Sequence, residues 1–223
     1  MKSRPGAAAA AVVIGLLASA CLLKEERHVL YLDPVSTAVT WVVFEHDVRS
    51  NEEEPADRLE EESEYWNTVQ AQGHPAARAF RALGASTIRT LHVRSEVPFS
   101  IVTDATFPGI EELGRRFIEE LGATGTSVLT REGDMTVWTA TLRPPAEDRE
   151  TDVSGLSAAD TVEVVLTSGR FESAVGFKLE QAGRIAILDG EQFGMDEDAE
   201  VVVSLRWTLA KEGAEAGRPS PIR

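Results

Sequence analysis

The single cysteine of this sequence stands where a secretory signal would be cut. Cys21 directly follows the small residues Ala18–Ala20, after an apolar run from Ala7 to Leu17 and the cations Lys2 and Arg4. A charged start, an apolar middle and a small-residue cleavage site are the three parts of a secretory signal. A buried structural cysteine has no reason to occupy the first position after the cut. We therefore predict that Cys21 is the first residue of the chain after cleavage and not a core residue.

Residues 1–20 followed by Cys21 resemble a bacterial lipoprotein signal. In that family the cysteine thiol is joined to diacylglycerol and its new amino group is then acylated. The resemblance implies that residues 1–20 are a signal peptide, Cys21 is the lipidation site and residues 21–27 are lipid anchor and tether. The protein would then reach the membrane through the lipid on Cys21, in the cell envelope. Leu22 at the next position resembles lipoproteins that go on to the outer membrane of a Gram-negative bacterium.

Two other interpretations of this segment stay open. Ala18-x-Ala20 also suits ordinary signal peptidase, which would release the protein without a lipid. The run Ala7–Leu23 is about the shortest that can cross a bilayer. An uncleaved N-terminal helix in the inner membrane is therefore the alternative anchor.

The sequence beyond residue 21 predicts no metal site and no cofactor. None of the four histidines lies in a paired ligand motif such as H-x-H or H-E-x-x-H, so a zinc site would need distant residues. In Glu45-His46-Asp47 the two carboxylates and the imidazole point to opposite faces of a strand, which favours a structural role. The acidic residues between Asp189 and Glu200 lack the EF-hand spacing, because Val201 stands where that loop requires glycine. The histidines are His28, His46, His74 and His92.

The sequence also predicts no catalytic residue. It contains neither a G-x-S-x-G nucleophile elbow nor a G-x-G-x-x-G loop after a strand. A hydrolase whose serine, histidine and carboxylate come from distant segments stays as a second alternative, because triad members need not be close in sequence. Three of the four tryptophans lie in alternating apolar runs, which favours places in the core over a ligand pocket. These three are Trp41, Trp138 and Trp207.

The charge of the chain limits its partners. The formal net charge is −15 at pH 7, and loss of the signal would also remove Lys2 and Arg4. Nucleic-acid binding depends on Lys and Arg neutralising phosphates, so we predict no nucleic-acid partner. An acidic body is also repelled by an anionic membrane surface. A protein partner with a basic surface is compatible with this charge.

Apolar alternation predicts an α+β fold, with a mostly antiparallel sheet of about ten strands and about three helices on one face. Apolar positions at helical spacing and proline starts indicate helices at 55–70, 75–83 and 108–121. We expect one α+β unit over residues 28–143 and a β-rich segment over 161–210 in the same domain. Between them, residues 144–160 have two prolines and a charge cluster, typical of a linker or long loop. Residues 211–223 read as a disordered tail.

These observations favour a lipid-anchored envelope protein that acts as a non-enzymatic binding or assembly module. The first alternative is a carrier whose hydrophobic ligand lies in a cavity between the sheet and the helix at 108–121, since small-molecule sites are concave and mostly apolar.

Overall fold

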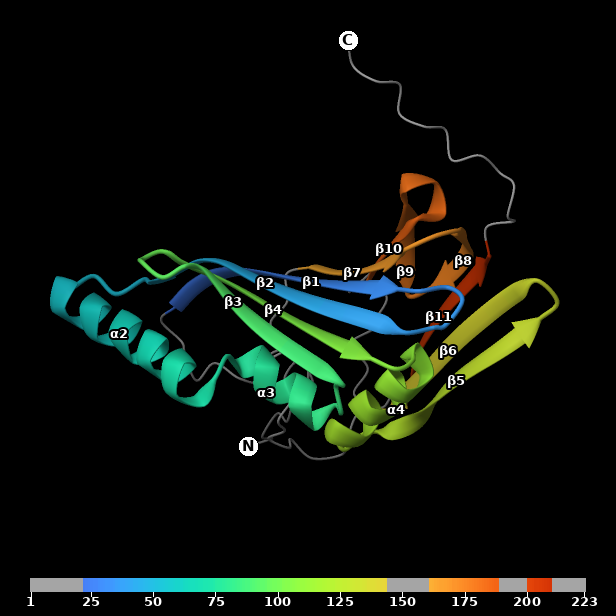
Figure 1. Ribbon diagram of the computed structural model, residues 1–223, viewed down its shortest axis with the longest axis horizontal. Coiled ribbons are helices and arrows are strands. Elements are labelled where there is room, and N and C mark those ends of the chain that lie inside the picture. Colours follow the sequence, from blue (N-terminus) through green and yellow to red (C-terminus); the bar gives the residue numbers. More distant parts are fainter. Residues whose placement is uncertain (1–21, 144–160, 189–199, 210–223) are drawn as a thin grey trace, which may run out of the picture.

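The computed structural model describes residues 22–143, 161–188 and 200–209 (Figure 1). The predictions made for the signal peptide, for Cys21, for the linker at 144–160 and for the tail at 211–223 lie outside these residues. The described chain forms two β-sheets with helices packed against them, which confirms the α+β class.

The larger sheet has seven strands in the order β3-β4-β2-β1-β7-β10-β9. β1 and β2 form a hairpin and pair in antiparallel register, with Leu30 opposite Trp41. One pair of the sheet, β1 with β7, is parallel. The bounds are β1 Leu22–Leu32, β2 Val39–Ser50, β3 Thr87–Arg94, β4 Phe99–Phe107, β7 Thr161–Leu166, β9 Phe177–Glu180 and β10 Ile185–Leu188.

The smaller sheet has four strands in the order β5-β6-β11-β8, all antiparallel. Its strands are β5 Thr124–Glu132, β6 Met135–Arg143, β8 Arg170–Val175 and β11 Val201–Thr208. The sequence predicts a single run from Phe171 to Glu180, but Gly176 breaks it with a φ of 75°. A positive φ is readily adopted by glycine, and here it turns the chain from one sheet into the other.

The strands therefore differ from the prediction in number and in grouping. The described residues contain eleven strands in two sheets, where we expected about ten in a mostly antiparallel sheet. The antiparallel character is confirmed apart from the β1–β7 pair. Local alternation reports which side of a strand is buried but not which neighbour it pairs with, so the sheet boundary could not be placed from the sequence.

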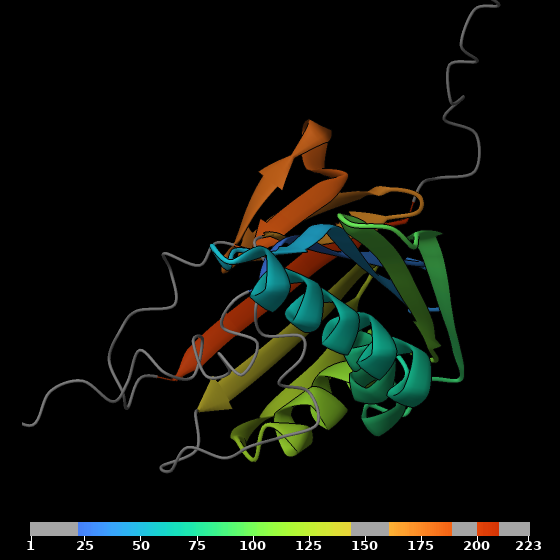
Figure 2. The same ribbon diagram turned by 90° about the vertical axis from the view of Figure 1, so that its left-hand side faces the viewer.

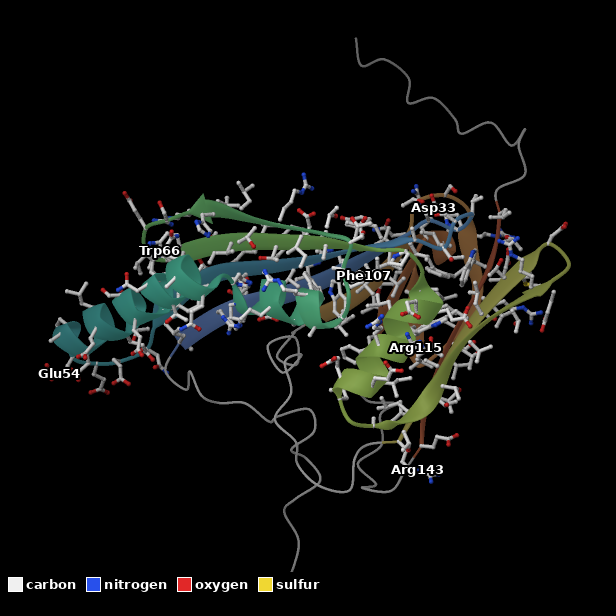
Figure 3. The ribbon with its side chains drawn as sticks, turned by 60° about the horizontal axis from the view of Figure 1, so that its bottom comes forward. Asp33, Glu54, Trp66, Phe107, Arg115 and Arg143 are labelled. Atoms are coloured by element: carbon white, nitrogen blue, oxygen red, sulfur yellow. The ribbon has the colours of Figure 1, made fainter. Side chains whose placement is uncertain are left out.

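The helices lie on one side of the seven-stranded sheet (Figures 1 and 2). They are α2 Pro55–Gln72, α3 Pro75–Ala82 and α4 Ile110–Glu120, and a short 3-10 turn, η2, covers Gln181–Gly183. Proline stands in the first turn of α2 and α3, as predicted. On α4 the exposed side carries Arg115, which projects away from the sheets and pairs with Glu112 (Figure 3). Hydrogen bonds from Arg115 and Arg116 lower the pKa of the exposed Glu112 to about 2.

A single apolar core joins both sheets and the helices. It includes Trp41, Trp138 and Trp207, which confirms the predicted core positions of these tryptophans. At Gly114, α4 packs closely against the smaller sheet. A Cβ added to this residue would come within 2.4 Å of the Ser127 hydroxyl and 3.4 Å of the Trp138 ring. At Gly114 the helix and the smaller sheet are therefore in direct contact.

Candidate functional site

Charged side chains are buried at the start of β1, on the face that looks toward the helices. Lys24, Glu26 and His28 alternate along the strand, and Glu26 and His28 are only 2% and 1% exposed. The sequence predicts residues 21–27 as anchor and tether, but β1 begins at Leu22. Residues 22–27 are therefore part of the sheet: they pair with β2, Lys24 bonds to Glu45 of β2 and Arg27 bonds to Glu163 of β7.

The central partner is Glu45 of β2. It lies directly opposite Glu26 and is 2% exposed. A bulge follows it, where the β2–β4 register shifts between Glu45 and Val48 and Asp47 takes a φ of 52°. The bulge leaves His46 and Asp47 exposed, so the Glu45-His46-Asp47 motif does not converge. The structural role predicted for this motif holds for Glu45.

Glu45 accepts hydrogen bonds from three elements. Its Oε1 faces Lys24 Nζ of β1 at 2.8 Å. Its Oε2 accepts from Tyr65 Oη of α2 at 2.7 Å and from His74 Nε2 just before α3 at 2.8 Å. One carboxylate thus ties β1, β2, α2 and α3 together.

A second carboxylate, Glu26, extends the network. Its Oε2 lies 2.5 Å from Lys24 Nζ, and its Oε1 lies 2.6 Å from His28 Nε2. Lys24 therefore bridges two carboxylates, with 28% of its side chain exposed. We refer to the six side chains of Lys24, Glu26, His28, Glu45, Tyr65 and His74 as the carboxylate–histidine cluster.

The hydrogen bonds of His74 define its tautomer. His74 caps the N-terminus of α3, where its Nδ1 accepts from the Ala76 backbone N–H at 3.3 Å. A ring nitrogen that accepts a hydrogen bond carries no proton, so the proton of the neutral ring is on Nε2, which donates to Glu45. His74 thus joins the start of α3 to the buried carboxylate.

Burial and the neighbouring donors act in opposite directions on the cluster. Burial alone would raise the pKa of Glu45, but the hydrogen bonds from His74 and Lys24 and the charge of Lys24 outweigh it and lower that pKa. Burial would lower the pKa of Lys24, but the charges of Glu45 and Glu26 outweigh it and raise that pKa. Burial and the charge of Glu45 both raise the pKa of Tyr65. At neutral pH Glu45 is therefore a carboxylate, and Lys24 and Tyr65 keep the protons that they donate to it.

These pKa shifts predict that the free energy of unfolding changes little over a wide pH range and falls at both ends of it. A carboxylate whose folded pKa is depressed stabilises the fold above its ordinary pKa of 4.5 and loses that contribution as the pH falls below it. Raised pKa values make Lys24 and Tyr65 stabilise the fold below their ordinary values of 10.5 and 10.0, with loss at higher pH. We expect urea unfolding from pH 3 to 11 to show both declines, and Glu45→Gln to flatten the acid decline. An unchanged acid decline in Glu45→Gln would contradict this assignment.

The cluster contains side chains that can act as general acids and bases, but a substrate could not reach them. Both histidine rings are 1% exposed, and their Nε2 atoms are directed at carboxylates. In the described residues no serine hydroxyl is bonded to a histidine ring; Ser50, for example, contacts Glu61. A triad needs a serine within reach of the imidazole. Within the same residues, no group of three or more His, Cys, Asp and Glu side chains is arranged to hold a metal ion.

The other candidate residues do not converge on this cluster. His46 is exposed and stacks on Phe44, and His92 lies at the edge of Trp66. Trp66 itself packs on Phe99 from α2 (Figure 3). Of the acidic loop Asp189–Glu200 only the last residue is described. An open depression of about 640 Å³ runs along residues 60–72 of α2, with a polar lining unlike the apolar cavity expected beside the helix at 108–121.

Sequence reasoning missed the cluster, although one signal was present. Lys24, Glu26 and His28 alternate with period two and continue into the strand predicted from His28, which is a strand pattern with polar residues on one face. Their charges are also typical of a solvent-exposed tether, which is the structure that the sequence analysis predicts for residues 21–27. Glu45 and His74 are 29 positions apart, so only the folded chain shows that they meet.

Fold and cluster together define an α+β protein whose first strand is held by buried ion pairs. No protein-family model and no curated protein matches the sequence. Among solved structures, the folded domain of the Mycobacterium tuberculosis LppM protein aligns over 86% of this chain and 92% of its own, with 9% identity and a TM-score of 0.38. The Danio rerio Fcho1 Mu homology domain, with a bound Eps15 peptide, aligns over 87% and 82%, with 7% identity and a TM-score of 0.20. Likenesses this weak establish no common fold. Among the described helices, none is long and apolar enough to span a membrane.

Proposed function

We propose that this chain is a lipid-anchored lipoprotein of the cell envelope, attached through Cys21, and that its body is a binding or assembly module. The observation that supports the proposal best is the position of β1. The strand begins at the residue after Cys21 and, from Arg27 on, lies between β2 and β7 inside the seven-stranded sheet. A lipid on Cys21 would therefore be joined to the body by one of its inner strands.

The energetics of lipidation fit a permanent attachment. Each buried methylene contributes about 0.8 kcal/mol, and a single myristoyl chain binds a membrane only marginally. Three acyl chains on one cysteine would hold the protein for its lifetime. Cleavage would remove Lys2 and Arg4 and change the formal net charge from −15 to −17, which favours a protein partner with a basic surface.

The two alternatives gain no support from the described residues. The carrier requires an apolar cavity beside α4, but at Gly114 Ser127 and Trp138 leave no room even for an added Cβ. The hydrolase requires a serine beside a histidine, but the hydrogen bonds of the described histidine rings go to Glu26, Gln70, Glu45 and the Ala76 backbone. The binding or assembly module is therefore the function that the geometry favours.

Radiolabelled palmitate tests the anchor directly. In a Gram-negative host, we expect the full-length protein to incorporate the label and to sediment with membranes, and Cys21→Ser to lose the label completely. Ser19→Ala, two residues away, is the matched control and should keep it. Equal labelling of the wild type and Cys21→Ser would refute lipidation. Labelling of neither protein, with membrane sedimentation retained by both, would favour the uncleaved helix.

A further inference from the structure

The strand β3 forms one edge of the larger sheet and is open to solvent (Figures 1 and 2). Among the described residues it pairs only with β4, and seven of its eight residues are exposed. Two of them are large apolar side chains, Leu91 and Val93, which are 64% and 58% exposed. An exposed edge strand presents a row of backbone N–H and C=O groups that can pair with another chain. β3 is therefore a place where an extended segment can add to the sheet.

The other edge strands among the described residues are less suited to such pairing. β9, at the far edge of the larger sheet, has four residues, and β8, at one edge of the smaller sheet, has six. Short edge strands are one device by which proteins prevent unwanted pairing. β5 is longer, but α4 packs against it at Ser127. Each of these three strands also contains a glutamate, whereas β3 contains no acidic residue.

The exposed face of β3 carries a defined pattern of charge. Three of its residues share the sheet face away from the core, because each lies opposite one of the alternate β4 residues of that face. They are Arg89, Leu91 and Arg94, opposite Asp104, Val102 and Ser100. The Arg89 side chain is 80% exposed although it pairs with Asp104, and the Arg94 guanidinium donates to the Val97 carbonyl. The row therefore reads cation, apolar, cation.

We propose that β3 binds an extended segment of a partner protein in which acidic and apolar residues alternate, and that this segment joins the sheet beside β3. In such pairing the backbone hydrogen bonds supply affinity and alternate side chains supply specificity. Acidic side chains of the segment would lie beside Arg89 and Arg94, and an apolar one beside Leu91. Side chains of the opposite parity would point toward the helices, where Trp66 of α2 lies edge-on to His92.

The charge of β3 is opposite to that of the whole chain. The basic surface favoured by the net charge and the acidic segment proposed here therefore address different parts of the molecule. At physiological ionic strength charges are screened over about 8 Å, so a segment in contact with β3 responds mainly to the arginines of that strand. The inference rests on the role of a binding module in the proposed function, but it does not depend on a lipid at Cys21.

Binding of synthetic peptides to the full-length protein in detergent tests the proposal. The probe is a fluorescein-labelled peptide as long as β3 in which glutamate and valine alternate, and the matched control has lysine in place of every glutamate. By fluorescence anisotropy we expect a Kd about 10-fold lower for the glutamate peptide, from two favourable in place of two unfavourable charge pairs. Amide hydrogen exchange of the complex should show new protection in β3 and none in β5. Equal Kd values, or new protection that leaves out β3, would overturn the proposal.

Charge reversal separates docking on β3 from general effects. Arg94→Glu should lose most of the preference for the glutamate peptide, and the double variant Arg89→Glu/Arg94→Glu should prefer the lysine peptide, a gain that misfolding cannot produce. Arg131→Glu, on the edge strand β5, changes the net charge as much as Arg94→Glu does and should keep the wild-type preference.

Two further outcomes would contradict the assignment of the edge. A preference that survives in the double variant would place the peptide elsewhere on the molecule. A dimer in which β3 is already protected without peptide would assign the edge to a second copy of the chain; we expect light scattering to show no such dimer. Cys21→Ser should bind the peptides as the wild type does whatever its palmitate result, so the two proposals fail separately.

Discussion

Replacement of Glu45 by glutamine should lower the free energy of unfolding by about 3–5 kcal/mol, the cost of removing one partner from a buried ion pair. Glu45 accepts from Lys24, Tyr65 and His74 while only 2% exposed. The neutral amide of glutamine leaves Glu26 as the only carboxylate beside the Lys24 ammonium. Its own N–H groups are donors, but Tyr65 and His74 also donate to this position and need an acceptor there. Urea unfolding at pH 7 measures the loss.

Glu163→Gln is the matched control for this result. It also removes a carboxylate from an ion pair of β1, but the Arg27 side chain in that pair is 56% exposed. Glu163 is itself buried, but the Arg27 guanidinium that remains can be hydrated, so the control should lose less than Glu45→Gln. Similar small losses in both variants would show that the cluster does not stabilise the fold.

Replacement of Trp207 by alanine should cost about 3–5 kcal/mol, the usual range for a large aromatic residue removed from a core. Trp207 of β11 is fully buried and lies edge-on to Phe171 of β8, with ring centroids 6.4 Å apart. Its Nε1 donates to the Pro34 carbonyl, in the turn between β1 and β2, at 3.3 Å. The variant therefore loses both a core side chain and a link between the two sheets.

The same variant tests whether the two sheets unfold together. Because Trp207 joins β11 of the smaller sheet to a turn of the larger one, we expect one cooperative transition in the wild type and in Trp207→Ala. Trp66→Ala, which removes a half-buried tryptophan from the surface helix α2, should lose less. Two separate transitions, or equal losses in the two tryptophan variants, would contradict the single core.

Several elements could be predicted because their residues carry the pattern themselves. The helix at 108–121 was found from apolar residues at helical spacing, and α4 buries Ile110 and Leu113 as predicted. The last strand was found from its alternation, with Leu205 and Trp207 in the core. The same alternation predicts Leu209 as a further inward residue of this strand, which is wrong: Leu209 lies beyond β11 and is 44% exposed.

The candidate site could not be predicted in the same way. Lys24 and Glu26 look like solvent-exposed residues in any local window, and they are buried only because Glu45 and His74 meet them. The break at Gly176 likewise depends on which strand each half pairs with: β8 with β11, and β9 with β10.

By itself, the sequence determined the α+β class, the helix positions, the tryptophan core and the expectation of a modified Cys21, because each follows from the side chains of one segment. Only the tertiary structure decided the two sheets, the parallel β1–β7 pair and the carboxylate–histidine cluster. The physical reason is that burying a charge is favourable only beside its partner. Where a partner comes from a distant segment, the chain's topology determines which charges can be buried.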